Sequence, residues 1–184
     1  MNTDTHHIYH LCASAAAGLW RRQRPSEAYQ QRVTAILLGT AATESHLRHR
    51  RQHGFAWHHD GGAWGLWQTE WGAVSDSLRM LRKGTVLSWR CGAWLMRDAD
   101  ANMRPFFEMR PEQVMPIIAG WDRLAVMFCR LHYLRVNQPI PETICEQAAY
   151  WKQYYNTKYG AGTVDKYLAD WQQHAAPVWG THGR

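Results

Sequence analysis

Apolar side chains recur at steps of three and four residues along most of the chain, and alternation with a period of two is nearly absent. This spacing is typical of helices that bury one face. One such stretch follows Ser26, a favourable N-cap, and places Tyr29, Val33 and Leu37 on one stripe. Gly54 is the clearest stop signal after it. The pattern therefore predicts a helix that begins near Ser26 and ends at Gly54.

Further helices are predicted by the same spacing, separated by turns that contain Gly or Pro. They run through residues 74–81, 86–96, 121–131 and 144–155, and a last helix follows Thr163 as N-cap and carries Tyr167, Leu168 and Trp171. The prolines at 105, 111 and 116 are expected to break the stretch between the helices at 86–96 and 121–131. Residues 54–70 are rich in Gly and aromatic side chains and have no helical period, so they predict an irregular loop or a short hairpin. Because neither a repeat nor a linker interrupts the pattern, residues 1–184 are predicted to form a single all-α domain.

Composition narrows the class of partner. The chain has 184 residues, 11 Trp, 17 Arg but only 4 Lys, and a formal net charge of +6. A basic, tryptophan-rich surface suits an extended anionic polymer with stackable faces, either nucleic acid or cell-wall glycan. No apolar stretch approaches the roughly 20 residues that a bilayer span requires, so no membrane span is expected. The apolar segment 12–20 has no Lys or Arg before it, so no secretory signal is expected either.

The tryptophans divide into two groups. Those at positions 89, 121, 151 and 171 fall on helical stripes, and we expect them to pack in the core. Those at positions 57, 64, 67 and 71 lie in or beside the loop, where an exposed aromatic face is able to stack on a sugar ring.

Glu44 is the most unusual candidate for chemistry, because it continues the stripe of Val33 and Leu37. A carboxylate on a buried face is costly unless it is paired, and burial raises its pKa. A carboxylic acid that is still protonated near neutral pH is able to donate a proton in glycoside cleavage. The alternative is an ordinary surface pair with Arg48, one helical turn further on.

Two motifs carry a resemblance to a known family. Thr43-Glu44-Ser45 is followed by Gly-Ala-Trp-Gly-Leu-Trp-Gln at residues 62–68, and this combination resembles the lysozyme-like lytic transglycosylases. Trp67 stands where the family usually has Met, and the gap between the two motifs is several residues longer. The resemblance implies a lysozyme-like helical fold and cleavage of the β-1,4 bond between N-acetylmuramic acid and N-acetylglucosamine, with no cofactor.

The resemblance also implies roles for individual residues. Glu44 would protonate the glycosidic oxygen and then act as the base while the 6-hydroxyl of muramic acid attacks C1. Ser45 would orient Glu44, and Gly65, Trp67 and Gln68 would hold the sugar. The family has a further aromatic-Asn step in a later segment, for which the candidates are Tyr155 with Asn156, or alternatively Tyr133.

A second carboxylate would change the reaction. Asp60 or Glu70 is placed in the sequence where it could position a water molecule, which would make the enzyme an inverting muramidase with carboxyl groups roughly 6.5–9.5 Å apart. Both residues lie in polar, turn-like sequence, which favours a solvated carboxylate without a catalytic role.

Histidines cluster near the same motifs. His46, His49 and His53 are spaced to share a helix face, and His58 and His59 follow them. Arginines between these histidines would repel a cation, and the chain has no HExxH motif. We therefore expect no metal site and no cofactor.

The sequence thus favours a peptidoglycan-cleaving enzyme whose partner is the glycan strand. Residues 150–163 resemble segments of phage-encoded proteins with lysozyme-like domains. The expected setting is synthesis in the cytoplasm, followed by action on the bacterial cell wall as a phage lysis enzyme (endolysin) or carriage in a phage particle. Two other classes stay open: an Arg-rich nucleic-acid-binding protein, and a non-catalytic glycan-binding or structural virion protein.

Overall fold

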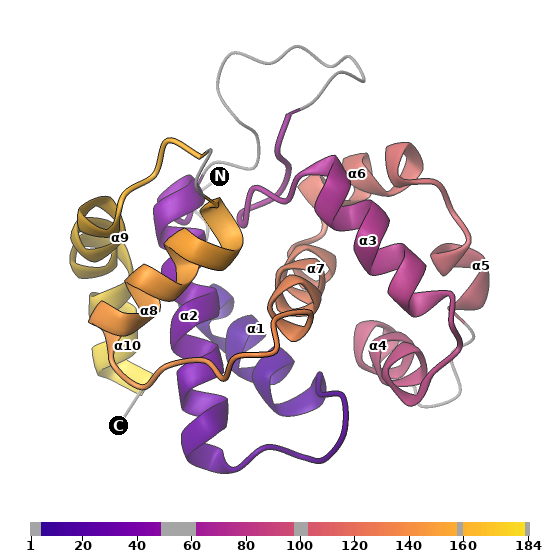
Figure 1. Cartoon of the computed structure of the whole chain (residues 1–184), viewed down its shortest axis with the longest axis horizontal. Helices are drawn as coiled ribbons and strands as arrows, with labels where there is room; N and C mark the ends of the chain where they lie inside the picture. Colours follow the sequence, from indigo (N-terminus) through magenta and orange to yellow (C-terminus); the bar gives the residue numbers. More distant parts are fainter. Residues whose placement is uncertain (1–4, 49–61, 98–102, 158–159, 183–184) are drawn as a thin grey trace.

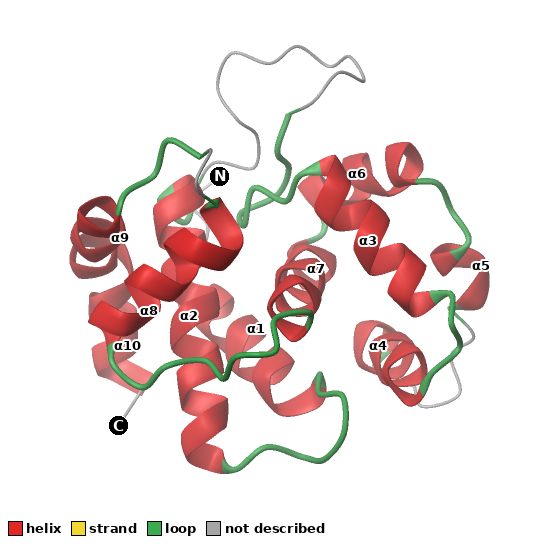
Figure 2. Ribbon diagram, viewed as in Figure 1, coloured by secondary structure: helices red, strands yellow, loops and turns green. Residues whose placement is uncertain are grey.

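The computed structural model describes residues 5–48, 62–97, 103–157 and 160–182. In this part of the chain the regular structure is helical, apart from an isolated antiparallel bridge between Trp64 and Thr69 (Figure 2). In chain order the elements are α1 (Thr5–Gly18), α2 (Glu27–Ser45), α3 (Trp71–Leu81), α4 (Val86–Met96), α5 (Arg104–Phe107), α6 (Pro111–Gly120), α7 (Asp122–Leu134), α8 (Ile144–Trp151), the π-helical turn η1 (Lys152–Asn156), α9 (Val164–Asp170), the π-helical turn η2 (Trp171–Ala175) and α10 (Ala176–His182). The predicted all-α domain is confirmed. None of the described helices combines the length and the apolar character needed to cross a bilayer.

Helix α2 is enclosed by other helices on all sides. Every residue from 33 to 43 is buried, and α1, α7, α8, α9 and η2 pack around it. The hydroxyl groups of Thr34, Thr40 and Thr43 each donate to the carbonyl four residues earlier, so the buried polar atoms keep hydrogen-bond partners. Helix α9 approaches closely at Gly39, where a Cβ atom would lie 2.0 Å from the Tyr167 hydroxyl oxygen. The sequence pattern predicted that one face of this helix is buried, whereas in the folded protein every face of residues 33–43 is buried.

Helix α7 joins two groups of helices (Figure 1). Helices α1, α2, α8, α9 and α10 lie on one side of it, and α3 to α6 lie on the other. Contacts of α7 with α1, α2, α3, α4 and α6 connect the groups. The main buried cluster has members from α1 to η2, and a smaller second cluster of Ala148, Trp151 and Tyr167 lies between α8 and α9.

The prediction that the second helix continues to Gly54 is wrong. α2 ends at Ser45, because His46 and Leu47 both adopt left-handed conformations with φ of 51° and 57°. The side chain of Leu47 is 1% exposed, so this turn returns an apolar residue to the core. Backbone N–H groups of His46 and Leu47 bond to the carbonyl oxygens of Ala42 and Ala41, which satisfies acceptors at the helix end.

Two other expectations are corrected, and one helix was missed. The pattern did not predict α1. Pro105 and Pro111 begin α5 and α6, as expected for residues that lack an N–H, but Pro116 lies inside α6. Burial of Val114 and Ile118 on either side of it compensates for the missing backbone bond. Trp89 was expected in the core and is 59% exposed instead.

The described part of the Gly/Trp-rich loop is a tight hairpin turn. Trp64 and Thr69 exchange two backbone hydrogen bonds of 2.9 and 3.1 Å, and Gly65 and Gln68 take left-handed conformations between them. The indole of Trp67 is fully buried, and its Nε1–H donates to the carbonyl of Leu37 at 2.8 Å. The turn is therefore fastened to the middle of α2.

We predict that Gly65→Ala destabilises the protein by about 2 kcal/mol, because the new Cβ would need a left-handed backbone at φ of 75° and would lie 2.9 Å from Ile118 Cγ2. The matched control is Gly72→Ala in α3, where a Cβ meets nothing within 4 Å. Urea denaturation followed by circular dichroism measures both free energies of unfolding. Equal values for the two variants would contradict the prediction.

Candidate active site

A pocket of about 360 Å³ opens beside the last turn of α2. Figure 1 shows that residues 62–70 run between the group containing α2 and α8 and the start of α3, and α7 and η1 lie close by. The residues that line the pocket are Glu44, Gln68, Thr69, Glu70, Ala73, His132, Tyr155, Asn156, Thr157 and Gly160. Both sequence motifs and the later Tyr-Asn step therefore meet at one place.

Glu44 lies at the pocket with its carboxyl group largely removed from water. The indole Nε1–H of Trp151 donates to Glu44 Oε1 at 3.2 Å. Burial raises the pKa of Glu44 to about 7, and the Trp151 hydrogen bond and the positive charge of Lys166 only partly oppose that rise. The charge of Glu70, across the same pocket, raises the pKa further. The carboxyl group is therefore able to hold or release a proton near neutral pH.

Lys166 connects this region to α9. Its Nζ donates to the carbonyl of Thr43 at 2.6 Å and to the carboxylate of Asp170. Asp170 is 8% exposed, whereas the Lys166 side chain is 44% exposed, so only the carboxylate side of the ion pair is shielded from solvent. Lys166 thereby fixes the backbone next to Glu44 and places a positive charge in its surroundings.

The turn η1 supplies Tyr155 and Asn156 to the pocket. The Tyr155 hydroxyl donates to the carbonyl of Trp67 at 2.6 Å, which joins η1 to the hairpin turn. Lys152 Nζ donates to Asn156 Oδ1 at 2.8 Å and to the carbonyls of Thr157 and Gly160. π-Helical turns are rare in proteins, but those that occur are often found at functional sites. They rotate the side chains that follow relative to those of a regular helix.

His132 is a lining residue that the sequence did not indicate as functional. Its Nε2 lies 2.7 Å from the carbonyl of Tyr154, and its Nδ1 lies 3.1 Å from Arg135 Nη2. Arg135 in turn pairs with Asp76 at 2.6 Å. Burial lowers the pKa of His132, so the ring is neutral at pH 7, with Nδ1 accepting from Arg135 and Nε2–H donating to η1.

Not every predicted residue reaches the pocket. Gln68 and Glu70 line it, and Gln68 Nε2 also donates to the carbonyl of Gly65 at 2.8 Å. Ser45 is buried and donates to the carbonyl of Ala41, whereas Gly65 packs beneath the turn. Trp67 belongs to the core. Ser45, Gly65 and Trp67 therefore do not line the pocket, and they support the residues that do.

The remaining predicted positions have different outcomes. Asp60 lies outside the described residues. Tyr133, the alternative to Tyr155 with Asn156, is 2% exposed and shares a 2.7 Å hydrogen bond with Thr40, so it belongs to the core. Trp151, His132 and Lys166 carried no local signal, because only the fold brings them to Glu44.

The histidine cluster differs from the spacing in the sequence. His46 lies beyond the end of α2, and His49, His53, His58 and His59 fall outside the described residues. His46 instead meets Asp170 and His174, with potential ligand atoms within 4.8 Å of one another. Lys166 pairs with the same Asp170, and the pKa of His174 is lowered mainly by burial and also by the nearby positive charges of Arg48 and Lys166. Both charges oppose the binding of a cation, so this group carries no metal assignment.

Comparisons of the chain with protein-family models, with curated proteins and with solved structures found no match. The case for a function consequently depends on the motifs and on the geometry of the Glu44 pocket.

We predict that Glu44→Gln stabilises the protein at pH 8 by on the order of 2 kcal/mol and has little effect below pH 4.5. The native state keeps the Glu44 proton up to a pH of about 7, whereas the unfolded chain loses it near 4.5. Wild-type stability therefore falls as the pH rises through this window, and the neutral amide avoids the loss. Urea denaturation at pH 4, 6 and 8 measures the difference. A difference that is independent of pH would show that Glu44 is not desolvated.

Proposed function

We propose that the protein cleaves the β-1,4 bond between N-acetylmuramic acid and N-acetylglucosamine in peptidoglycan, as a lytic transglycosylase. The observation that carries the proposal is the desolvated carboxyl group of Glu44, with a pKa of about 7, in a pocket that also receives Gln68 and Tyr155. These residues come from the motifs whose pattern resembles that family. A pocket of about 360 Å³ is within the range of roughly 300–1,000 Å³ that small-ligand sites occupy.

In the proposed mechanism Glu44 acts twice. The protonated carboxyl donates its proton to the glycosidic oxygen, and the bond from that oxygen to C1 of muramic acid breaks. The resulting carboxylate then accepts the proton of the 6-hydroxyl group as its oxygen bonds to C1, which gives a 1,6-anhydro end and returns Glu44 to its starting state. One group with a pKa near the working pH is suited to both steps.

The neighbouring residues support this sequence of steps. The Trp151 indole N–H stays bonded to the carboxyl group and stabilises its ionised form between the two proton transfers. Gln68 and Asn156 present amide groups at the pocket wall, where they suit the hydroxyl and acetamido groups of the sugar. The proposed setting is a phage product that acts on the bacterial cell wall, either as a lysis enzyme or from the phage particle.

Glu44→Gln is expected to lower the rate of cleavage by about 10²- to 10⁴-fold, because the amide neither donates nor accepts the transferred proton. Mass spectrometry of the soluble products from purified peptidoglycan measures the rate, and circular dichroism checks the fold. Glu142→Gln serves as the matched control, since that side chain is 74% exposed and pairs with Arg32 away from the pocket. Near-normal cleavage by Glu44→Gln would remove Glu44 from the mechanism. If wild type releases no muropeptides, the result favours a binding or structural role.

A second candidate function is an inverting muramidase. Glu70 lines the same pocket and its charge raises the pKa of Glu44, so it is the described carboxylate best placed to position a water molecule.

The products distinguish the two reactions. We expect 1,6-anhydro ends and a Glu70→Gln variant that keeps cleavage within about threefold of wild type, because transglycosylation needs no second carboxylate. Reducing muramic ends, together with a loss in Glu70→Gln comparable to that in Glu44→Gln, would establish hydrolysis instead.

A further inference from the structure

Helix α4 carries an apolar face that no described residue covers. Among the described residues, four large apolar side chains are exposed, and three of them belong to α4: Val86 at 59%, Trp89 at 59% and Met96 at 49%. Their spacing of three and seven residues places them on one side of the helix. An exposed apolar stripe of this kind indicates an interaction surface.

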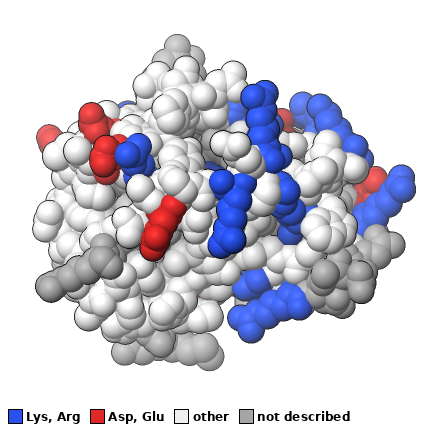
Figure 3. Space-filling model, turned by 90° about the horizontal axis from the view of Figure 1, so that it is seen from below, with Lys and Arg blue, Asp and Glu red and all other residues white. Residues whose placement is uncertain are grey.

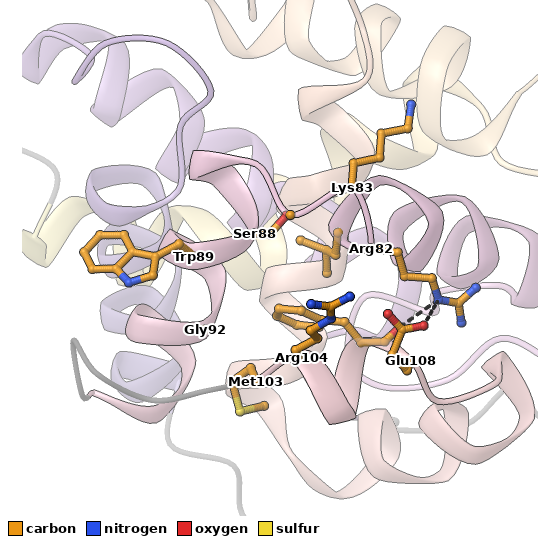
Figure 4. A pocket seen from close by; sticks show the side chains of 11 residues that line it. Arg82, Lys83, Ser88, Trp89, Gly92, Met103, Arg104 and Glu108 are labelled. Atoms are coloured by element: carbon orange, nitrogen blue, oxygen red, sulfur yellow. Dashed lines mark hydrogen bonds and ion pairs between the residues drawn. The ribbon is translucent and has the colours of Figure 1, made fainter.

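A cavity of about 510 Å³ lies beside this stripe, between α4, the end of α3 and α5. Leu81, Met103 and Phe107 give it an apolar lining, and Trp89 forms one wall. Figure 4 shows Trp89 on one side of the cavity and Arg82, Arg104 and Glu108 on the other. The cavity is therefore apolar inside and predominantly basic around its edge.

The basic residues at the edge are held in different ways. Arg82 donates to the carbonyls of Phe107 and Met109 at 2.9 and 2.8 Å and lies 3.7 Å from Glu108. Lys83 is exposed and makes no ion pair with any residue that the structure describes. Among the described residues that line the cavity, Arg82, Lys83 and Arg104 are basic and Glu108 is acidic, so this described part of the edge carries more positive than negative groups.

Further cations extend this charge around α4. The guanidinium of Arg90 lies 3.2 Å from the centre of the Trp20 ring, and Arg21 donates to Met80 Sδ at 3.3 Å. These contacts hold the connection between α1 and α2 against α3 and α4. Figure 3, seen from below Figure 1, shows Lys and Arg side chains gathered on the half of this face where α3 and α4 lie.

The combination favours a lipid surface over other anionic partners. Nucleic acid is bound through phosphate contacts and through aromatic rings that stack on bases, which leaves exposed Val86 and Met96 without a role. A second copy of the chain would bring the same positive charge against itself. The exposed Val86, Trp89 and Met96, with Lys and Arg side chains beside them, supply the apolar and cationic groups that a protein surface needs to bind an anionic bilayer.

We propose that the α4 face, defined here as Val86, Trp89, Met96, Lys83 and Arg104 with the adjoining cavity, docks on a bilayer that contains anionic phospholipid. The apolar side chains enter the boundary between headgroups and acyl chains, and the cations contact lipid phosphates. This inference does not depend on the proposed cleavage of peptidoglycan, and the two are measured separately.

Sedimentation with lipid vesicles tests the proposal. Wild-type protein is expected to sediment with vesicles of equimolar phosphatidylglycerol and phosphatidylcholine, and not with phosphatidylcholine alone, and added salt should weaken the binding. Lys83→Glu should reduce the affinity at least about tenfold, because it replaces attraction with repulsion. Trp89→Ala should reduce it several-fold, since the exposed indole is the largest apolar group on the face.

Two matched controls separate a specific face from general charge and hydrophobicity. Trp71→Ala removes another exposed tryptophan, and Arg48→Glu reverses another exposed charge, both outside the α4 face. Both controls should bind as wild type does. Circular dichroism establishes that each variant is folded.

Several results would overturn the proposal. They are equal binding to neutral vesicles, no binding to anionic vesicles, or equal losses in the α4 variants and the controls. A Trp89→Ala variant that loses self-association in analytical ultracentrifugation, without any vesicle binding by wild type, would assign the face to a second copy. Loss of binding to duplex DNA in Lys83→Glu, again without vesicle binding by wild type, would assign it to nucleic acid.

Discussion

The burial of α2 on all sides is the constraint on which the candidate site depends. Residues 33–43 are enclosed by α1, α7, α8, α9 and η2, and Glu44 follows directly at the point where the helix reaches a pocket. The same packing that stabilises the core therefore removes water from one carboxyl group. The free energy of this desolvation appears as the raised pKa of Glu44, because the protonated form is the cheaper one to bury. A helix exposed along one side would leave the same residue an ordinary surface acid.

Two irregular segments, the hairpin turn and η1, form walls of the pocket. A chain of hydrogen bonds connects them to α2, one after the other. The carbonyl of Leu37 accepts from the Trp67 indole, and the carbonyl of Trp67 accepts from the Tyr155 hydroxyl. His132 then bonds to the carbonyl of Tyr154, which secures η1 to α7. Each contact uses a buried or partly buried donor, so breaking one would leave an unsatisfied polar group. The positions of the lining residues are thus set relative to Glu44 by specific hydrogen bonds in addition to apolar packing.

The protein presents two surfaces with opposite physical character. The Glu44 pocket combines two carboxyl groups with amides and a neutral imidazole, whereas the α4 face combines exposed apolar side chains with cations. The first suits proton transfer within a small enclosed volume, and the second suits an extended anionic surface. No described residue lines both the Glu44 pocket and the cavity beside α4, so ligands at the two places need not compete for the same side chains.

The sequence by itself determined the helical class, most helix positions and the identity of Glu44 as the unusual carboxylate, because these depend on local periodicity and on short motifs. It also indicated Gln68, Tyr155 and Asn156, which the fold brings to the same pocket as Glu44. Tertiary structure alone decided that α2 ends at Ser45, since burial of Leu47 outweighs the helical pattern that continues beyond it. It also reversed the expectations for Trp67, which packs in the core, and Trp89, which lies on the surface, because burial depends on which elements pack against each side chain and not on the local pattern. Trp151, His132 and Lys166 act on the site across long separations in sequence, and a contact of that kind leaves no local signal.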